Sequence, residues 1–503
     1  MDENQAWAAI EAVERQSLPD LFAAEPDRLS RLALDLPGLR FDFAKTHLTA
    51  RLLAGFEALA EARDLTGARD DLFAGNIVNP TEGRAAEHSA ERGQGAPESV
   101  ARAAGLHARM RALIDAIEAE AFGPVRHILH LGIGGSALGP DFLIDALGRG
   151  SGRYEAAIVS NVDGAALAQA VADFDPHTTL LVVASKTFTT LETLLNARSA
   201  LAWMAQGGVA DPYGRIVALT AAPERAVEFG VDETRILPFA ESVGGRYSLW
   251  SSIGFPAALA LGWDAFETLL EGAAAMDRHF RFAPLLENAP VLAAFADRYY
   301  ANVRGAGTRA VFAYDERLRL LPPYLQQLEM ESNGKSVKLD GVPVGRATSP
   351  IVWGGVGTDA QHAVFQLLHQ GTLLVPVEFV ASVEPGHALD DEHHRQLLIN
   401  CFAQGAALMS GKTNDDPHRF YPGDRPSTTI LLDRVDPATL GALIAFYEHR
   451  TFVNAVLLGI NPFDQFGVEL GKQMAKAIDG GDALDFDPST EALIARALAE
   501  DAP

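Results

Sequence analysis

The spacing of hydrophobic residues divides this 503-residue chain into parts with different periodicity. Over residues 1–110, apolar positions recur at helical intervals, which predicts an N-terminal helical region. From residue 127 the pattern changes to short apolar runs, each followed by a loop rich in glycine or hydroxyl side chains and then by a helical stretch. Strands that alternate with helices in this way indicate a parallel sheet, which we place in a domain at residues 111–265.

The alternation begins again in a second α/β domain, which we place at residues 266–475. The apolar runs interpreted as strands are residues 128–131, 156–160, 180–184 and 216–219 in the first domain, and 310–314, 351–353, 373–380 and 428–432 in the second. Asp436-Pro437 is a typical helix start, with a side-chain cap followed by proline at the first helical position. A C-terminal helical extension is expected at residues 476–503, with an amphipathic helix at 487–498.

The formal net charge of −25 argues against nucleic acid and anionic membranes as partners, because an acidic surface repels both. One cysteine, Cys401, allows no intramolecular disulfide and no cysteine-based metal cluster, as is common in a reducing compartment. The first residues are acidic and no apolar core follows them, unlike a secretory signal. We therefore expect a cytoplasmic protein.

The apolar stretch at residues 442–460 is long enough to be tested as a membrane span. Glu448, His449 and Arg450 interrupt it. We therefore predict a buried core helix at this position, and no segment that crosses a bilayer.

Residues 326–335, with the sequence QQLEMESNGK, place an amide and a carboxylate at a fixed helical offset. Gln327 and Glu331 are four residues apart, so on an α-helix their side chains share one face. One of them can bind a substrate while the other reacts with it. Asn333-Gly334 predicts that the helix ends in a left-handed cap. The structural alternative is an amphipathic surface helix with solvated carboxylates.

Two loops suit the binding of anions. Residues 132–140 form a glycine-rich link between a predicted strand and a predicted helix, where backbone N–H groups can approach an anion, but the G-x-G-x-x-G fingerprint of dinucleotide-binding domains is missing. Residues 185–190, SKTFTT, gather four hydroxyls and one lysine at a helix start. Such donors suit a phosphate monoester. A polar capping loop is the alternative for residues 185–190, and we favour phosphate binding over it.

Arg246 directly follows two glycines, so its backbone can lie close to a ligand, and its permanent charge suits the stabilisation of an oxyanion. His362 is near the start of a predicted helix, although a lone histidine is more often structural, as we expect for His369. Gln465 and Lys472 are seven residues apart, two turns of an α-helix, and would lie on one face of it.

Together these groups suit proton transfer on a small phosphorylated sugar. Moving a carbonyl between carbons 1 and 2 requires a base that carries the proton and a cation that stabilises the enediolate, and Glu331 and Arg246 fit these tasks. A cyclic sugar must also be opened by an acid and a base, which His362 and Lys472 can supply. No cofactor and no metal is required, because both redox changes occur within one molecule.

Six segments resemble the phosphoglucose isomerase family, in the family's order: residues 132–140, 185–190, 244–248, 327–335, 357–362 and 465–472. The resemblance implies interconversion of glucose 6-phosphate and fructose 6-phosphate, in glycolysis and gluconeogenesis. It also implies an α/β fold class, with two sugar-isomerase-type three-layer αβα domains whose sheets are rich in parallel strands. A helical N-terminal region and C-terminal helices would complete the chain.

The same resemblance implies the role of each site residue. Those expected to hold the phosphate are Ser185, Lys186, Thr187 and Thr190. Those expected to line the rest of the substrate site are Gly135, Ser136, Gln327 and Gln465.

By the same resemblance, Glu331 would be the isomerisation base and Arg246 would stabilise the intermediate. His362 would assist ring opening from the neighbouring subunit of a homodimer, with Lys472 beside it. Ala137 departs from the family, in which many members carry a larger or polar residue. The N-terminal region matches weakly, through residues 79–84, NPTEGR.

Two other classes of function remain as alternatives. A sugar-phosphate sensor could use the loop at residues 185–190, but it would not need the four catalytic candidates. A metal-dependent isomerase could use His393-His394 beside Asp390, Asp391 and Glu392 as ligands. Adjacent residues on a helix point in different directions, so a solvated helix start is the better interpretation of that segment.

Overall fold

The computed structural model describes residues 1–149, 153–480 and 485–498. The chain divides into two compact units, Met1–Pro462 and Phe463–Pro503, and both sheets lie in the first unit. The expected α/β class with two parallel-rich sheets is confirmed. The division at residues 110, 265 and 475 stays a prediction.

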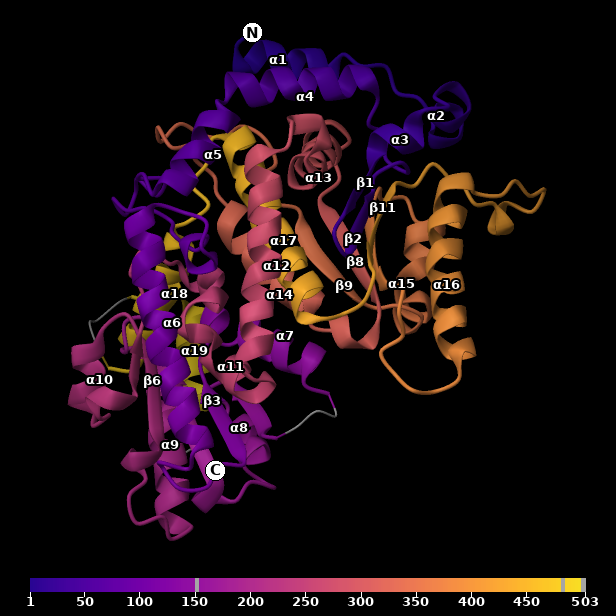
Figure 1. Cartoon of the computed structure of the whole chain (residues 1–503). Helices are drawn as coiled ribbons and strands as arrows, with labels where there is room; N and C mark the ends of the chain where they lie inside the picture. The colour runs from indigo at the N-terminus through magenta and orange to yellow at the C-terminus, as the bar shows by residue number, and fades with distance from the viewer. Residues whose placement is uncertain (150–152, 481–484, 499–503) are drawn as a thin grey trace. The chain divides into compact units, whose positions relative to one another are not determined.

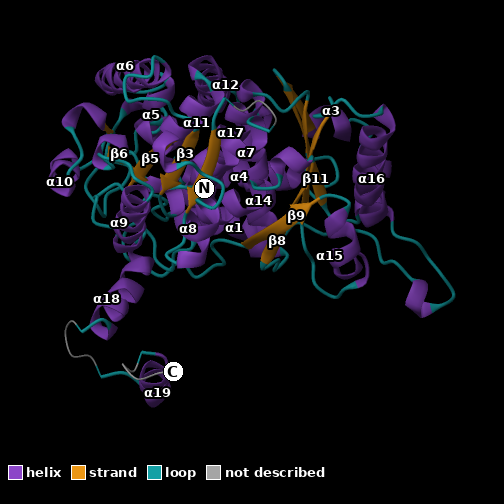
Figure 2. Cartoon of the chain, turned by 90° about the horizontal axis from the view of Figure 1, so that it is seen from below, coloured by secondary structure: helices purple, strands orange, loops and turns teal. Residues whose placement is uncertain are grey.

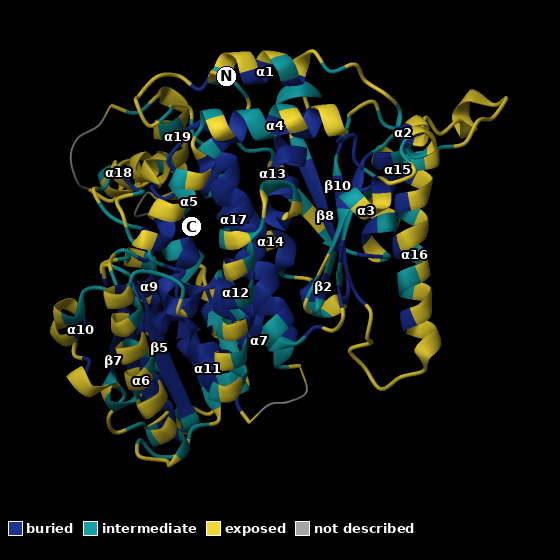
Figure 3. Cartoon of the chain, turned by 45° about the horizontal axis from the view of Figure 1, so that its top comes forward, coloured by how far each residue is buried: buried dark blue, intermediate teal, exposed yellow. Residues whose placement is uncertain are grey.

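The first sheet has five parallel strands in the order β4-β3-β5-β6-β7. Its strands are β3 (His127–Leu131), β4 (Glu155–Val159), β5 (Thr179–Ala184), β6 (Ile216–Thr220) and β7 (Ile236–Pro238). The four predicted strands are confirmed, whereas the three residues of β7 are too few to show a pattern. β5 is buried along its whole length, as Figure 3 shows in dark blue. A continuous apolar run is typical of such a central parallel strand.

Helices cover this sheet on two sides. Those that belong to it are α6 (Pro97–Glu118), α7 (Leu138–Leu147), α8 (Gly164–Ala170), α9 (Leu191–Gln206) and α10 (Pro223–Phe229). Figure 2 shows α6 on one side of β3, β5 and β6, and α8 and α9 on the other. Leu181 and Val183 of β5 share a core with Ala197 and Met204 of α9.

The second sheet has six strands in the order β1-β2-β11-β10-β8-β9. Four of them are mutually parallel: β8 (Thr308–Tyr314), β9 (Ile351–Val356), β10 (Val377–Ser382) and β11 (Ser427–Leu432). The predicted strands are confirmed, except that β10 begins at Val377 and not at residue 373. Pro376 lies just before that start, and a proline has no N–H to give to a sheet.

A β-hairpin from the N-terminal region extends the second sheet. β1 (Ala33–Leu36) and β2 (Leu39–Asp42) pair antiparallel, and β2 pairs antiparallel with β11. Gly38 in the turn has φ +76°, which glycine adopts readily. The helical pattern did not predict this hairpin, because each strand has only four residues. The rest of the region is mainly helical, with α1 (Glu3–Glu11), α2 (Leu18–Ala24), α3 (Arg28–Leu32), α4 (Ala50–Ala62) and α5 (Leu65–Ala74).

Long helices lie between the two sheets in Figure 1, among them α12 (Trp263–Phe282) and α17 (Pro437–Leu458). The shorter α11 (Phe255–Leu261) and α13 (Ala289–Arg298) accompany them. α17 is buried over almost its whole length, including the charged Glu448 and Arg450. The prediction of a core helix is therefore confirmed, and its start is capped by Asp436, whose side chain accepts the Thr439 N–H at 2.9 Å. Within the described ranges, no helix has the length and apolarity needed to cross a membrane.

Three helices follow strands of the second sheet: α14 (Leu321–Leu325), α15 (Asp359–Gln370) and α16 (Asp391–Ser410). Figure 2 shows α15 and α16 on the outer side of that sheet. The second unit contains α18 (Glu469–Ile478) and α19 (Pro488–Ala497). Asp487 caps α19 through the N–H groups of Ser489 and Thr490, which confirms the helix predicted at the end of the chain.

Candidate active site

The loop at residues 185–190 follows the carboxyl end of β5 and leads into α9, as its sequence predicted. Its hydroxyls form two pairs, Ser185 with Thr190 at 3.0 Å and Thr187 with Thr189 at 2.7 Å. Phe188 has φ +50°, an uncommon conformation for a residue with a side chain. The loop therefore brings its hydroxyls together at the start of a sixteen-residue helix, where an anion is favoured.

The ammonium of Lys186 bridges two loops. Its Nζ donates to the carbonyl oxygens of Glu241 at 2.6 Å and Val243 at 3.1 Å. Burial, followed by the nearby charge of Arg84, lowers the pKa of Lys186 to about 8. Because residue 243 lies three positions before Arg246, Lys186 connects the loop at residues 185–190 to the segment that carries Arg246.

The glycine-rich loop touches that same segment. Residues 134–136 form a short 3₁₀ turn, η2 (Gly134–Ser136), after β3. A Cβ atom on Gly135 would lie 2.1 Å from the carbonyl oxygen of Gly245, so only glycine allows this approach. Gly134 has φ +58°, and a Cβ there would lie 2.7 Å from Nε2 of Gln327. The structure thus brings the loop together with Gln327 and with the Arg246 segment.

His130, in β3, makes a hydrogen bond to this loop. Its Nε2 lies 2.6 Å from the carbonyl oxygen of Ser136, and its ring is fully buried. Burial lowers the pKa of His130 to about 4, so the ring is neutral near pH 7 and donates from Nε2. Ser136 is thereby held at the edge of the site.

The segment with Gln327 and Glu331 is a π-helical turn, η11 (Gln326–Glu331), and not the α-helix that was expected. π-Turns are rare, and they occur frequently at functional sites. The two side chains still meet, with Gln327 Nε2 donating to Glu331 Oε2 at 3.1 Å.

The expected left-handed cap at Asn333-Gly334 is wrong, because neither residue has a positive φ. Lys335 instead provides hydrogen bonds for the carbonyl groups at the end of the turn. Its Nζ donates to the carbonyl oxygens of Glu331 at 2.9 Å and Ser332 at 2.8 Å. A lysine at a helix C-terminus can bond the last carbonyls in this way.

Arg246 lies in the 3₁₀ segment η6 (Gly245–Trp250) and faces the π-turn. Its Nη1 lies 3.4 Å from Glu331 Oε2, and its Nε donates to Ser332 Oγ at 2.7 Å. Its Nη2 donates to the carbonyl oxygen of Pro462. The guanidinium is almost fully buried, whereas the Glu331 side chain is 23% exposed, so the carboxylate can be reached by a ligand.

Two sets of residues at this site were not predicted from the sequence. Ser332 Oγ accepts a hydrogen bond from Nε of Arg246, and it also lies 2.9 Å from the hydroxyl of Tyr247. Asn461, just before the carbonyl that Arg246 contacts, donates to Asn79 Oδ1 at 2.8 Å and to Thr81 Oγ1 at 2.7 Å. The family-like segment at residues 79–84 was the available signal for this second contact.

His362 lies in the first turn of α15 and is exposed. Thr358, before the helix, has φ +56° and ψ −51°, an outlier for a β-branched residue. His369 has a structural contact, because its Nε2 lies 2.9 Å from Gln404 Oε1.

Gln465 and Lys472 belong to the second unit and are exposed in it. Gln465 precedes the 3₁₀ turn η13 (Phe466–Val468) and has φ −152°, while Lys472 lies in α18. The expectation that one helix presents both side chains on one face is therefore wrong, because α18 begins at Glu469.

A cavity of about 1210 Å³ opens elsewhere, at the carboxyl ends of the strands of the second sheet. Thr358, His387 and His393 are among its lining residues, and none of the catalytic or substrate-binding candidates is. His394, once considered a metal ligand, is bonded through Nε2 to the carbonyl of Val383 at 2.8 Å. In the described residues, nowhere do three or more histidine, cysteine or acidic side chains gather closely enough to hold a metal ion. The candidate site that we consider further is the one at Glu331 and Arg246, where Gln327 also donates to the carboxylate.

The family described as Phosphoglucose isomerase matches residues 42–494 of this sequence. The chain belongs to this family. A glucose-6-phosphate isomerase from Rhizorhabdus wittichii is 74% identical over 493 residues, which cover 98% of this chain and 99% of that protein. One from Zymomonas mobilis is 65% identical over 494 residues, with 98% and 97% covered.

The fold agrees with membership in the phosphoglucose isomerase family. The crystal structure of a glucose-6-phosphate isomerase from Chlamydia trachomatis matches with a TM-score of 0.89 at 31% identity, over 97% of each chain. A hypothetical protein from Thermus thermophilus matches with a TM-score of 0.67 at 25% identity, over 88% of this chain and all of the other. The resemblance found in six short segments is thus confirmed over nearly the full length.

Proposed function

We propose that the protein catalyses the reversible isomerisation of glucose 6-phosphate and fructose 6-phosphate, a reaction of glycolysis and gluconeogenesis. Five relatives at 62–74% identity bear the name Glucose-6-phosphate isomerase. The observation that carries the mechanism is the approach of Glu331 and Arg246 to 3.4 Å at the end of a π-turn. A partly exposed carboxylate beside a buried guanidinium suits proton transfer at a carbon next to a carbonyl.

In this mechanism Glu331 removes the proton from carbon 2 of the open-chain aldose. The electrons of the C–H bond form the double bond of an enediolate, and the negative charge develops on the oxygen of carbon 1. Arg246 stabilises that charge. The hydroxyl at carbon 2 transfers its proton to the oxygen of carbon 1, which moves the negative charge to the oxygen of carbon 2. That oxygen forms the ketone as Glu331 returns the proton to carbon 1. No electron leaves the sugar in these steps.

The phosphate would be held by the loop after β5, through the hydroxyls of Ser185, Thr187 and Thr190. Lys186 would add positive charge there. The residues that we assign to the rest of the sugar are Gly135, Ser136, Gln327 and Gln465. The convergence of residues 134–136, Gln327 and the Arg246 segment supports this assignment.

We assign ring opening to His362 and Lys472. We also propose that the active form is a homodimer. The exposure of His362 on α15 supports a role in the site of a neighbouring subunit. One of the two groups would protonate the ring oxygen while the other removes the proton of the anomeric hydroxyl.

Turnover of fructose 6-phosphate by the purified protein, in a coupled assay, tests this function. An enzyme produces glucose 6-phosphate, whereas a sugar-phosphate sensor binds it without turnover. Activity that survives exhaustive chelation would exclude a metal-dependent isomerase. In heavy water, deuterium should enter carbon 2 of the aldose product, and its absence after long incubation would favour hydride transfer over a proton-carrying base.

A further inference from the structure

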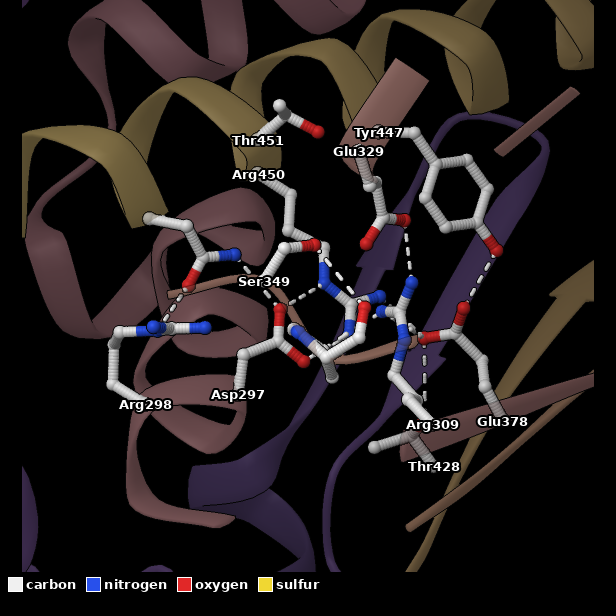
Figure 4. Close-up of polar contacts among 12 residues, drawn as sticks. Asp297, Arg298, Arg309, Glu329, Ser349, Glu378, Thr428, Tyr447, Arg450 and Thr451 are labelled. Carbon is white, nitrogen blue, oxygen red and sulfur yellow. Dashed lines mark hydrogen bonds and ion pairs between the residues drawn. The ribbon is translucent and has the colours of Figure 1, made fainter. Parts of the chain in front are cut away.

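The π-turn that carries Glu331 rests on a cluster of buried charges, shown in Figure 4. We call the buried charge cluster the set Asp297, Arg309, Glu329, Glu378 and Arg450. The members come from α13, β8, the π-turn, β10 and α17, and each is less than 10% exposed. Elements that are distant in sequence thus meet at this point.

Arg450 forms the centre of one half of the buried charge cluster. Its Nε and Nη2 donate to the two carboxylate oxygens of Asp297 at 2.7 and 2.6 Å, and its Nη1 donates to Glu378 at 2.6 Å. Tyr447 adds a bond from its hydroxyl to Glu378 Oε1 at 2.8 Å. The two bonds from Arg450 to Asp297 make a bidentate pair.

Arg309 forms the other half and connects to the turn. Its Nη2 donates to Oε1 of Glu329, and its Nη1 lies 3.6 Å from Asp297 and 3.9 Å from Glu378. Arg309 lies in β8, which is paired on both sides, with β9 and with β10. Glu329 is therefore tied to one of the most firmly held strands of the sheet.

The ion pair between Arg309 and Glu329 is not explained by stability alone. A buried ion pair loses hydration on both sides, and its replacement by apolar residues of similar size is often neutral or stabilising. Nε of Arg309 is buried and makes no hydrogen bond with any described residue, which adds to the cost. Such a pair is better explained by the geometry that it imposes.

That geometry concerns Glu331, two residues further along the same π-turn. A π-turn is a rare conformation, so contacts outside the turn must hold it. Glu329 is anchored to β8 and Asn333 is anchored through its Nδ2 to the carbonyl of Thr451 on α17 at 3.1 Å. Ser332 is held by Arg246. Glu331 is thus fixed from both sides, with its own side chain facing the site.

We propose that Glu329 is a positioning residue, whose ion pair with Arg309 fixes the π-turn so that the Glu331 carboxylate faces the reacting carbons. This proposal rests on the proposed role of Glu331 as the base. It predicts that the loss of the pair slows the proton transfer much more than it weakens substrate binding, because the loop at residues 185–190, proposed to hold the phosphate, belongs to the other sheet.

The variant Glu329→Gln keeps the size of the side chain and removes its charge. We expect kcat to fall roughly 10- to 100-fold, since a misplacement of about 1 Å can cost on the order of 10²-fold in rate. The Kd of sorbitol 6-phosphate, which lacks a carbonyl and cannot react, should stay within about twofold of the parent value. The isotope effect on kcat with glucose 6-phosphate deuterated at carbon 2 should rise, because proton transfer becomes the slower step.

Tyr447→Phe is the matched control, since it removes one hydrogen bond from the same cluster, and that bond goes to Glu378 of β10 and not to the π-turn. We expect it to lower Tm and to leave kcat within about twofold of the parent value. If Glu329→Gln lowers Tm in the same way and also leaves kcat and the isotope effect unchanged, Glu329 is purely structural and the proposal fails.

Two further variants complete the test. If Glu329→Gln yields no folded protein, the same measurements are made on Glu329→Asp. This variant keeps the negative charge, but its side chain is shorter by one methylene group, so the carboxylate lies further from Arg309. Glu331→Gln separates the two proposals. An inactive Glu331→Gln beside a fully active Glu329→Gln contradicts only the positioning role, whereas a fully active Glu331→Gln contradicts the base itself.

Discussion

Glu331 accepts two hydrogen bonds on one oxygen, from Gln327 and from Arg246, and these bonds fix the direction of its carboxylate. An oxygen held in this way has little freedom to rotate before it meets a substrate. This defined orientation suits the proton transfer between neighbouring carbons that we propose for Glu331.

Replacing that carboxylate by an amide should separate chemistry from binding. Glu331→Gln keeps the size of the side chain and removes its basicity, so we expect kcat to fall by at least about 10²-fold, the lower end of what a general base contributes. The Kd of sorbitol 6-phosphate should change little. Glu224→Gln, an exposed position on α10, is the control and should retain full kcat. Near-normal turnover of Glu331→Gln would contradict its role as the base.

Lys186 belongs to the loop at residues 185–190, which we propose holds the phosphate, and its ammonium also donates to the carbonyl oxygens of Glu241 and Val243. Its replacement should therefore affect both binding and rate. For Lys186→Met, the loss of a charged hydrogen bond, about 1.5–3 kcal/mol, predicts a KM for fructose 6-phosphate that is at least tenfold higher. A smaller fall in kcat should accompany it as the Arg246 segment loosens. Steady-state kinetics measure both values.

Arg225 offers a matched comparison, since its Nη1 donates to the carbonyl of Thr187 at 2.9 Å from the exposed side of the same loop. Arg225→Met should leave KM within about twofold, because an exposed cation contributes little. An unchanged KM in Lys186→Met would show that the phosphate does not depend on this charge.

At the scale of elements, the sequence predicted strands and helices wherever a pattern extended over enough residues. The four expected strands of the first sheet and the buried helix α17 are examples, since burial imposes a long apolar signal. The π-turn could not be predicted, because Gln327 and Glu331 meet in an α-helix as well as in a π-turn. The actual cap by Lys335 depends on a contact that local propensity does not encode.

The N-terminal cap of α17 allows a test of how much this helix contributes to the stability of the protein. Asp436 forms a capping box with Thr439 at the end of this buried helix, and Asp2 forms one with Gln5 at the peripheral α1. Asp436→Ala should lower the free energy of unfolding by roughly 1 kcal/mol, the usual value of a cap. Asp2→Ala should cost less in global unfolding, because α1 can fray locally.

Denaturant unfolding followed by circular dichroism measures both variants. Activity of Asp436→Ala should remain normal below the transition, since its cap lies outside the site. Equal losses in the free energy of unfolding would contradict the expectation that the buried α17 contributes more to global stability than the peripheral α1.

Across the whole molecule, neutral buried histidines should make the fold sensitive to acid. Burial lowers the pKa of His130 and of His279 to about 4, well below the usual value near 6.5. The unfolded chain therefore binds more protons than the folded one in this range. The stability that these groups contribute is fully present above about pH 6.5 and is lost as the pH falls toward 4.

His279→Gln tests this dependence, because the variant removes one titrating ring. Nε2 of His279 accepts the N–H of Ala289 at 3.0 Å, a bond that requires an unprotonated nitrogen. We expect Tm of the parent protein to fall more steeply between pH 6.5 and 4.5 than Tm of the variant, with parallel curves above pH 7. Equal slopes throughout would contradict the assignment. Differential scanning calorimetry gives both curves.

The sequence predicted that Glu331, Arg246, Gln327 and the loop at residues 134–136 share one site, and the structure brings these residues together, while their roles stay predictions. What the sequence could not predict is how they are held. The contacts of Arg246 with Ser332 and with the Pro462 carbonyl join positions that are 86 and 216 residues apart. No local sequence pattern predicts contacts between residues so far apart in the sequence, because these contacts depend on the packing of the whole unit.

The hairpin of β1 and β2 has a consequence for biosynthesis. β2 finds its partner in β11, whose residues leave the ribosome almost four hundred codons later. Until then this hairpin has an unpaired edge, which is a template for wrong pairing with other nascent chains. The second sheet can therefore close only near the end of translation, and a chain that stops before residue 427 would leave the edge of β2 open.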